Sequence, residues 1–180
     1  PTDKAPNGLV VVVPDLFGSR FTCGDVPAWP DGVREVAANG IEWLLTPPEP
    51  AASQATDLLP VYGPLVQALA GEFSVKPFPY DPRLPLDQAV DDLQALLPRL
   101  LNKGRQRVHL VAHGSGCLVA LGLRERGSVL WQTLQRGGGR TVLLSPPLFG
   151  TWTAPRRVSG QDELTSALTL LRPELSAQRV

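Results

Sequence analysis

Residues 108–120 read VHLVAHGSGCLVA, and this segment decides the fold predicted for the chain. Apolar, largely β-branched residues lead into a cluster of small ones, and an apolar helical pattern follows at once. This order predicts a strand, a sharp turn and a helix, an arrangement that can hold a catalytic nucleophile on a strained backbone. Such a turn needs small residues two positions before and two positions after its centre, and Ala112 and Gly116 meet that need. The central residue is Gly114, which has no side chain.

Other apolar segments predict the remaining framework. Strands are predicted at Gly8–Pro14, Phe73–Tyr80 and Thr141–Leu144. Helices are predicted at Tyr62–Ala70, from Asp87 to Leu101 with a kink at Pro98, and from the turn to Arg126. Strands that alternate with helices predict an α/β fold, a three-layer α/β/α sandwich with a mostly parallel, buried sheet. Ligand sites in such sheets lie beyond the carboxyl ends of the strands. Loops 14–20, 113–117 and 145–150 are expected to converge there.

The length of the chain suggests one domain. The chain has 180 residues and no methionine, so we treat 1–180 as a single domain that belongs to a larger protein. Segment 21–60 contains many prolines and no clear period, which predicts an irregular, lid-like excursion with one short strand at Ile41–Leu45. A last amphipathic helix is expected from Asp162, with Leu164, Leu168 and Leu171 on one face.

Composition excludes several classes of function. Seventeen Lys and Arg balance seventeen Asp and Glu, so no basic field favours nucleic acid. No apolar run approaches the length of a transmembrane helix, and the first residues do not resemble a signal peptide. The two cysteines, Cys23 and Cys117, form neither a disulfide framework nor a zinc site. We therefore expect no metal or cofactor, and a reduced, cytoplasmic compartment.

Four segments, in order, resemble the lecithin:cholesterol acyltransferase-like branch of the α/β-hydrolases. Residues 11–19 (VVVPDLFGS) are similar to its strand followed by Pro-Gly-x-x-Gly-[Ser/Asn], and residues 79–83 (PYDPR) to its Pro-Tyr-Asp-Trp-Arg. Residues 108–120 resemble its HLVAHSMGGLVA, and residues 145–151 (SPPLFGT) resemble its GTPHLGS. The resemblance runs from Leu9 to about Leu171. It implies a truncated α/β-hydrolase-like fold, and lipid-ester or acyl-transfer chemistry in active members.

The same resemblance shows what this chain lacks. Gly114 stands at the place of the nucleophilic serine, and Asp15 replaces the glycine of the family's oxyanion loop. Family members carry their acid and histidine late in the chain. This chain has two histidines, His109 and His113, and both precede Gly114. The nucleophile and the general base are therefore both missing.

The resemblance also implies a ligand site that needs no side-chain nucleophile. The oxyanion donors would be the backbone N–H groups of Leu16 and Ser115, so an anion or carbonyl pocket is expected to remain. Asp15, Phe17 and His113 are expected to border it, and Asp15 is expected to disturb the oxyanion loop.

These observations favour a degenerate hydrolase domain of lipid metabolism, a pseudoenzyme that acts as a binding or scaffolding module. Its expected partners are other domains or protein chains, with a lipid or acyl group as a ligand. The alternative is an active lipid esterase or O-acyltransferase that uses Ser115, or that another segment completes. A shift of the nucleophile to Ser115 would place His113 and Cys117 where small residues belong, which favours Ser115 as the start of the helix. A third hypothesis is a protein-interaction domain. An open cleft with free donors would argue for ligand binding, and a filled one for interaction alone.

Several side chains have a structural and a functional interpretation. His113 is a base or a metal ligand, or a packed, hydrogen-bonded side chain; His109 is expected in the core. Cys117 is an activated thiol or a small buried hydrophobe. Asp81 and Arg83 bind a ligand, or form a buried ion pair at a strand end. We favour the structural interpretation of the two histidines and of Cys117, and the residues leave the choice for Asp81 and Arg83 open.

Overall fold

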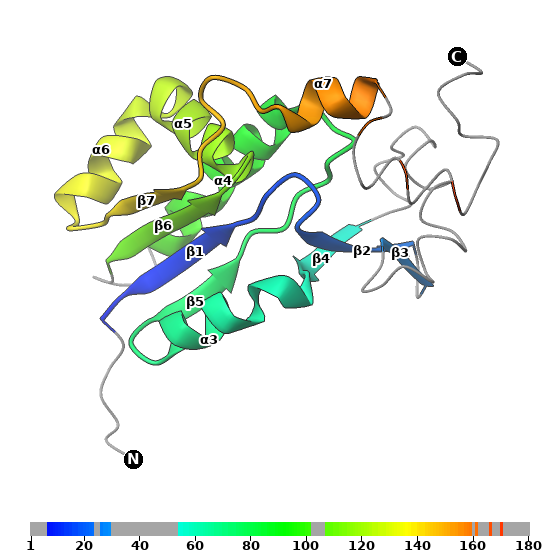
Figure 1. Cartoon of the computed structure of the whole chain (residues 1–180). Coiled ribbons are helices and arrows are strands. Elements are labelled where there is room, and N and C mark those ends of the chain that lie inside the picture. The colour runs from blue at the N-terminus through cyan, green and yellow to red at the C-terminus, as the bar shows by residue number, and fades with distance from the viewer. Residues whose placement is uncertain are drawn as a thin grey trace.

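The computed structural model describes residues 7–23, 26–29, 54–101 and 107–159, together with 161, 166 and 170. A central sheet of four strands has the order β5-β1-β6-β7 (Figure 1). All neighbouring strands pair in parallel. Their bounds are β1 Leu9–Val13, β5 Ser74–Pro77, β6 Val108–His113 and β7 Thr141–Leu144.

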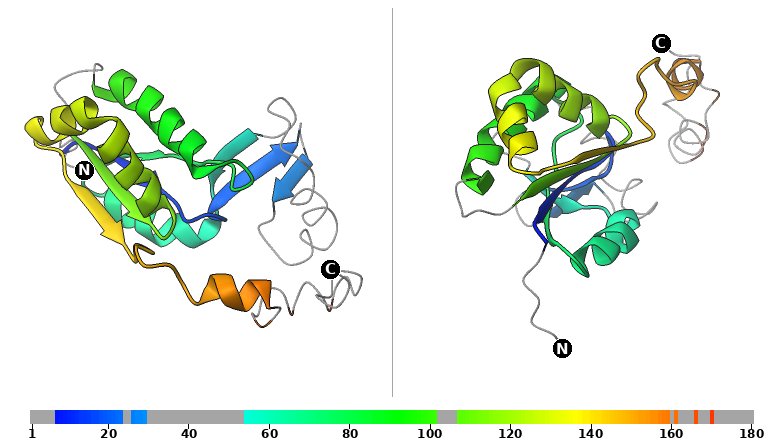
Figure 2. Two further views of the ribbon diagram at one scale, coloured as in Figure 1. Left: turned by 90° about the horizontal axis from the view of Figure 1, so that it is seen from above. Right: turned by 90° about the vertical axis from the view of Figure 1, so that its left-hand side faces the viewer.

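Helices cover both faces of this sheet (Figure 2). Helix α3 (Gly63–Ala70), which follows the short 3-10 helix η2 (Pro60–Tyr62), lies on one face. The other face carries α4 (Leu86–Leu101), α5 (Gly116–Arg126) and α6 (Ser128–Arg136). The predicted three-layer α/β/α sandwich with a parallel sheet is therefore confirmed. The sequence pattern did not predict α6 or the short α7 (Thr153–Val158).

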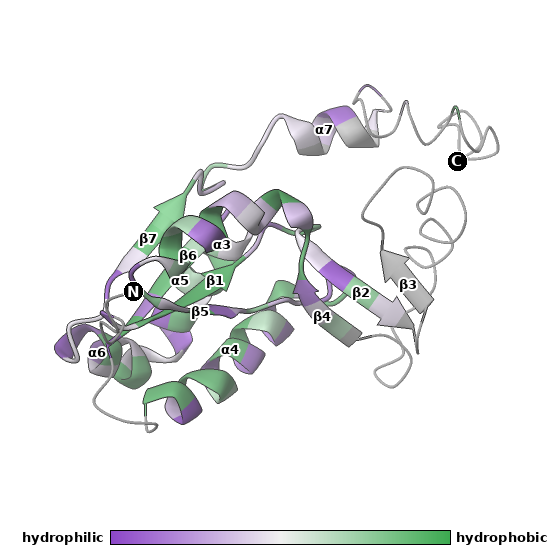
Figure 3. Cartoon of the chain, turned by 90° about the horizontal axis from the view of Figure 1, so that it is seen from below, coloured by the Kyte–Doolittle hydropathy of each residue, from purple (hydrophilic) through white to green (hydrophobic). Residues whose placement is uncertain are grey.

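Strand β1 explains why this sheet forms. Its five residues are all apolar and four of them are buried, as expected for a strand covered on both faces. Val11 and Val13 join the core under α4 and α5, whereas Val10 and Val12 join the core under α3. Figure 3 shows that β1 is hydrophobic along its length, whereas hydrophobic and polar residues alternate along α4. The apolar face of α4 persists although Pro98 lies inside the helix.

A second sheet was not predicted. Strands β2 (Ser19–Cys23), β3 (Val26–Trp29) and β4 (Gln54–Leu58) pair antiparallel in the order β3-β2-β4, within the segment expected to be irregular. The register shifts beside Phe21 in both pairings because β3 and β4 each have one extra residue opposite β2. In β4 the adjacent Thr56 and Asp57 are both exposed, which breaks the period-two alternation that would reveal a strand. Phe21 itself is fully buried. The strand expected at Ile41–Leu45 and the apolar face of the helix expected from Asp162 lie outside the described residues.

The prediction that β7 is buried is wrong for one face of the strand. Val142 and Leu144 are 47% and 36% exposed. Val142 pairs with Val111, whose side chain lies under α3, and β7 is the last strand of the sheet. In the part of the chain that the structure describes, no helix covers this end of the α3 face. None of the described helices has the length and apolar character needed to cross a membrane.

Tyr80 fastens the loop after β1 to the chain that follows β5. Its side chain is 4% exposed, its hydroxyl donates to the carbonyl of Pro14 at 3.2 Å, and its backbone N–H donates to Ser19 Oγ at 3.0 Å. Burial, with a smaller contribution from the negative charge of Asp15, raises the pKa of the Tyr80 phenol well above 10. The folded state therefore keeps this proton when the unfolded chain loses it.

This shift in the pKa predicts a loss of stability at high pH. The contribution of the neutral phenol is complete below the unfolded pKa of about 10 and falls as the pH rises above it, by up to about 1.4 kcal/mol per pH unit. Chemical denaturation of wild type and Tyr80→Phe between pH 8 and pH 11 measures it. The free-energy difference between the two proteins should shrink above pH 10; a difference that stays constant contradicts the prediction.

Candidate functional site

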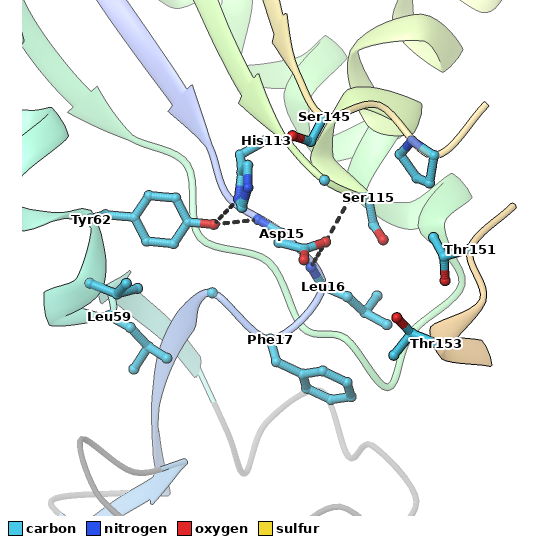
Figure 4. Close-up of a pocket in the computed structure, with 14 residues that line it drawn as sticks. Asp15, Leu16, Phe17, Leu59, Tyr62, His113, Ser115, Ser145, Thr151 and Thr153 are labelled. Atoms are coloured by element: carbon cyan, nitrogen blue, oxygen red, sulfur yellow. Dashed lines mark hydrogen bonds between the residues drawn. The ribbon is translucent and has the colours of Figure 1, made fainter. Parts of the chain in front are cut away.

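A cavity of about 800 Å³ lies at the carboxyl ends of the parallel strands (Figure 4). The three loops expected to converge there all contribute to it. Its lining comprises Asp15, Leu16, Phe17 and Gly18 from the first loop, His113, Gly114 and Ser115 from the second, Ser145 and Pro147 from the third, and also Leu59, Val61, Tyr62, Thr151 and Thr153. Every residue expected at the site thus borders one cavity.

The predicted strand, turn and helix are present. Strand β6 ends at His113, α5 begins at Gly116, and Gly114 between them has a φ of +53°. The N–H of Gly114 donates to the carbonyl of Leu144 at 3.0 Å, which fixes the turn to the end of β7. A left-handed backbone at the centre of the turn is the strained conformation that the sequence pattern predicted.

The carboxylate of Asp15 occupies the space between the two expected oxyanion donors. Its Oδ1 accepts hydrogen bonds from the N–H of Leu16 at 2.8 Å and from the N–H of Ser115 at 2.7 Å. The expectation that these donors remain free for an anion or carbonyl is therefore wrong. The physical reason is local: a carboxylate accepts from backbone N–H groups at the N-terminus of a helix more strongly than a neutral oxygen does. The side chain of Asp15 itself thus occupies the place where an oxyanion would bind.

Gly114 and Asp15 share one volume. A Cβ atom placed on Gly114 would lie 2.3 Å from both Cγ and Oδ1 of Asp15 and 2.7 Å from Oδ2. The Asp15 carboxylate thus fills the space that a side chain at position 114 would need. The glycine at position 114 and the aspartate at position 15 are two separate departures from the pattern of the family that the sequence resembles, and in the structure they face each other.

Tyr62 supports this arrangement from the opposite side. Its hydroxyl accepts from the N–H of Asp15 at 2.7 Å and lies 2.9 Å from Nδ1 of His113. The hydroxyl therefore joins the backbone of the first loop to the side chain at the end of β6. Burial raises the pKa of Tyr62, so the hydroxyl stays protonated. Sequence reasoning missed Tyr62, because no local pattern signals a contact across 47 residues.

Ser115 is placed as the start of a helix. It is the N-cap of α5, with φ −64° and ψ −24°. No hydrogen bond joins its hydroxyl to His113 among the described residues, and Figure 4 shows Asp15 between Tyr62 and Ser115. His113 is a packed, hydrogen-bonded side chain, as expected. A serine with φ of +51° follows β7 at position 145 and borders the same cavity.

Cys117 and the Asp81–Arg83 pair have structural roles. Cys117 is fully buried, and burial raises the pKa of its thiol, so the small-hydrophobe interpretation holds. Asp81 and Arg83 form an ion pair at 2.7 Å, with side chains 12% and 7% exposed, which confirms the buried-pair interpretation. His109 lies in β6 and packs edge-on against Phe73, and desolvation lowers its pKa.

The cavity combines features that the sequence presented as alternatives. It is open, but its two backbone donors are already paired. Within the described segments no group of three or more His, Cys, Asp and Glu side chains could hold a metal ion. The described side chains around the cavity offer one carboxylate, the imidazole of His113, several hydroxyls and apolar walls, and none of the described serine hydroxyls there is hydrogen-bonded to His113. Such a site can bind a small molecule by shape and hydrogen bonding.

The resemblance to a hydrolase family rests on four sequence segments, and residues from three of them line the cavity. The fourth contains Asp81 and Arg83, which pair with each other, and Tyr80, which holds the carbonyl of Pro14. Comparisons of the chain with protein-family models, with curated proteins and with solved structures found no match.

Proposed function

We propose that this domain is a catalytically degenerate relative of the lecithin:cholesterol acyltransferase-like hydrolases that binds a ligand where its active relatives turn one over. One observation carries the proposal: the Asp15 carboxylate sits on the N–H groups of Leu16 and Ser115, beside a turn whose central residue is Gly114. The lipid setting of this proposal comes from the resemblance. So does the expectation that further domains or chains are its partners.

Charge opposes catalysis at this site. Acyl transfer builds negative charge on the substrate oxygen, and an oxyanion hole accelerates the reaction because its donors face that charge. Here both donors face a carboxylate that is already negative. A tetrahedral intermediate would have to displace Asp15 or form beside it, and no side chain at position 114 could attack. Loss of even one oxyanion donor typically costs about 10²–10³-fold in rate.

The geometry still favours binding. A cavity of about 800 Å³ is within the range of roughly 300–1,000 Å³ found for small-molecule sites. Leu16, Phe17 and Leu59 supply apolar walls, and the loop hydroxyls supply polar contacts. The buried thiol of Cys117 is free, as expected for a protein of a reduced, cytoplasmic compartment, which we include in the proposal.

Labelling with a fluorophosphonate tests the absence of catalysis. We expect no covalent adduct on the folded domain, measured by intact-mass and peptide mass spectrometry, because no described serine in the cavity is paired with a base. Ser115→Ala is the matched control, since it removes the one hydroxyl at the turn. A stoichiometric adduct on Ser115 that disappears in the control would establish the esterase or acyltransferase alternative and overturn the proposal.

A further inference from the structure

We infer that the cavity selects ligands that carry a protonated amine on an apolar body, and that it disfavours carboxylates and phosphates. The inference rests on the proposed function, because it names the ligand class of the same cavity. It reverses the preference of an empty oxyanion hole, which favours negative charge. This change of preference follows from the different surroundings of the two carboxylate oxygens of Asp15.

One oxygen of the Asp15 carboxylate is paired and the other is available to a ligand. The hydrogen bonds from Leu16 and from Ser115 both go to Oδ1 of this carboxylate. Among the described residues no hydrogen bond reaches Oδ2, and Asp15 itself lines the cavity. A carboxylate oxygen accepts hydrogen bonds and cannot donate them. A ligand group that approaches Oδ2 must therefore be a donor, and a cationic donor makes the stronger bond.

The charge of Asp15 is not balanced by a strongly basic side chain in the described walls of the cavity. None of the residues that line the cavity in the described part of the chain is lysine or arginine. Asp15 is the one aspartate or glutamate among them, and the hydroxyl of Tyr62 stays protonated because burial raises its pKa. The lining thus carries the negative charge of Asp15 without a lysine or arginine to match it. A bound ammonium would neutralise it, whereas a bound carboxylate would double it at short distance.

Both polar and apolar side chains line the cavity around the carboxylate. Figure 4 shows Tyr62 and Leu59 on one side of Asp15, and Ser115, Thr151 and Thr153 on the other. The threonine hydroxyls can accept the remaining protons of an ammonium group. Leu16 and Phe17 offer apolar contact to the ligand's body. The cavity therefore has places for both parts of an amphipathic amine.

Three probes with one tail and different head groups test the inference: octylamine, octanol and octanoate. We would titrate each at neutral pH and follow the backbone amide resonances of Leu16 and Ser115 by NMR. Octylamine should bind at least about tenfold more tightly than octanoate, with octanol between them. The matched variant is Asp15→Asn, whose side-chain oxygen can still accept from both N–H groups while its amide replaces Oδ2 with a donor. This variant should lose about tenfold in octylamine affinity and gain octanoate binding.

Each other result counts against the inference. Octanoate that binds the wild type as tightly as octylamine, and shifts these two amides, would mean that an anion displaces Asp15. Octylamine affinity that is unchanged in Asp15→Asn would mean that the carboxylate does not select the ligand. If no probe shifts the cavity resonances, the ligand class is wrong, while an unlabelled Ser115 leaves the degenerate function standing. A fluorophosphonate adduct on Ser115 would instead remove the proposed function itself.

Discussion

Gly116→Ala is expected to destabilise the domain by about 3 kcal/mol, at the upper end of the usual cost of overpacking a core. Gly116 is the first residue of α5 and is buried against the end of β1. A Cβ at this position would lie 2.3 Å from the carbonyl oxygen of Pro14 and 2.8 Å from that of Val13. These backbone atoms, at the end of β1 and in the residue that follows it, cannot rotate away as a side chain can. The helix would have to move off the strand, and the packing of α5 on the sheet would be lost with it.

Gly63→Ala is the matched control. Gly63 is the first residue of α3, has φ −50° and ψ −50°, and has no neighbouring group within 4 Å of the place that an alanine Cβ would take. The same substitution there should leave stability unchanged or raise it by about 0.4–1 kcal/mol, because alanine reduces the freedom of the unfolded chain. Urea denaturation of both variants measures the contrast. Equal effects at the two helix starts would show that the close approach of α5 to β1 does not constrain Gly116.

The sequence allowed prediction of the framework because a few local patterns carry it. The apolar run of β1 requires burial on both faces, and the small residues Ala112 and Gly116 require a turn packed closely against the sheet. Each requirement shows in a short stretch of sequence, so it can be recognised without knowing which distant residues pack against it. The same holds for α4, where Leu93 and Leu97 recur at helical spacing and are fully buried.

What sequence reasoning missed depends on contacts between distant residues. Asp15 and Ser115 are 100 positions apart, and nothing near either one shows that a carboxylate oxygen of the first meets the N–H of the second. Tyr62 reaches the site from yet another segment. The exposed side chains of β7 have a similar cause, because an apolar strand has the same pattern whether or not a helix covers it. Asp15 was identified as a departure from the family pattern, but its role as the occupant of the donor pair follows from geometry alone.

The pairing of Asp15 with Gly114 predicts strong non-additivity. Gly114→Ala should cost roughly 2–4 kcal/mol, since the new Cβ meets the Asp15 carboxylate and the residue must keep a left-handed backbone. Asp15→Ala should cost roughly 1.5–3 kcal/mol, because two charge-assisted hydrogen bonds are lost. The double variant should be more stable than the sum of these losses by at least about 1 kcal/mol, since removal of the carboxylate makes room for the Cβ.

Gly150→Ala distinguishes the two causes of the destabilisation expected for Gly114→Ala, the clash with Asp15 and the strain of a left-handed backbone. Gly150 also has a positive φ, +83°, but nothing lies within 4 Å of an added Cβ. Its substitution should therefore show the backbone strain alone, about 1 kcal/mol. The excess cost at Gly114 should disappear when Asp15 is also alanine, as measured by denaturation of all four members of the cycle. Losses that add to within about 0.5 kcal/mol would mean that the two residues do not compete for one volume. The absence of a side chain at the turn would then have a cause other than the aspartate that faces it.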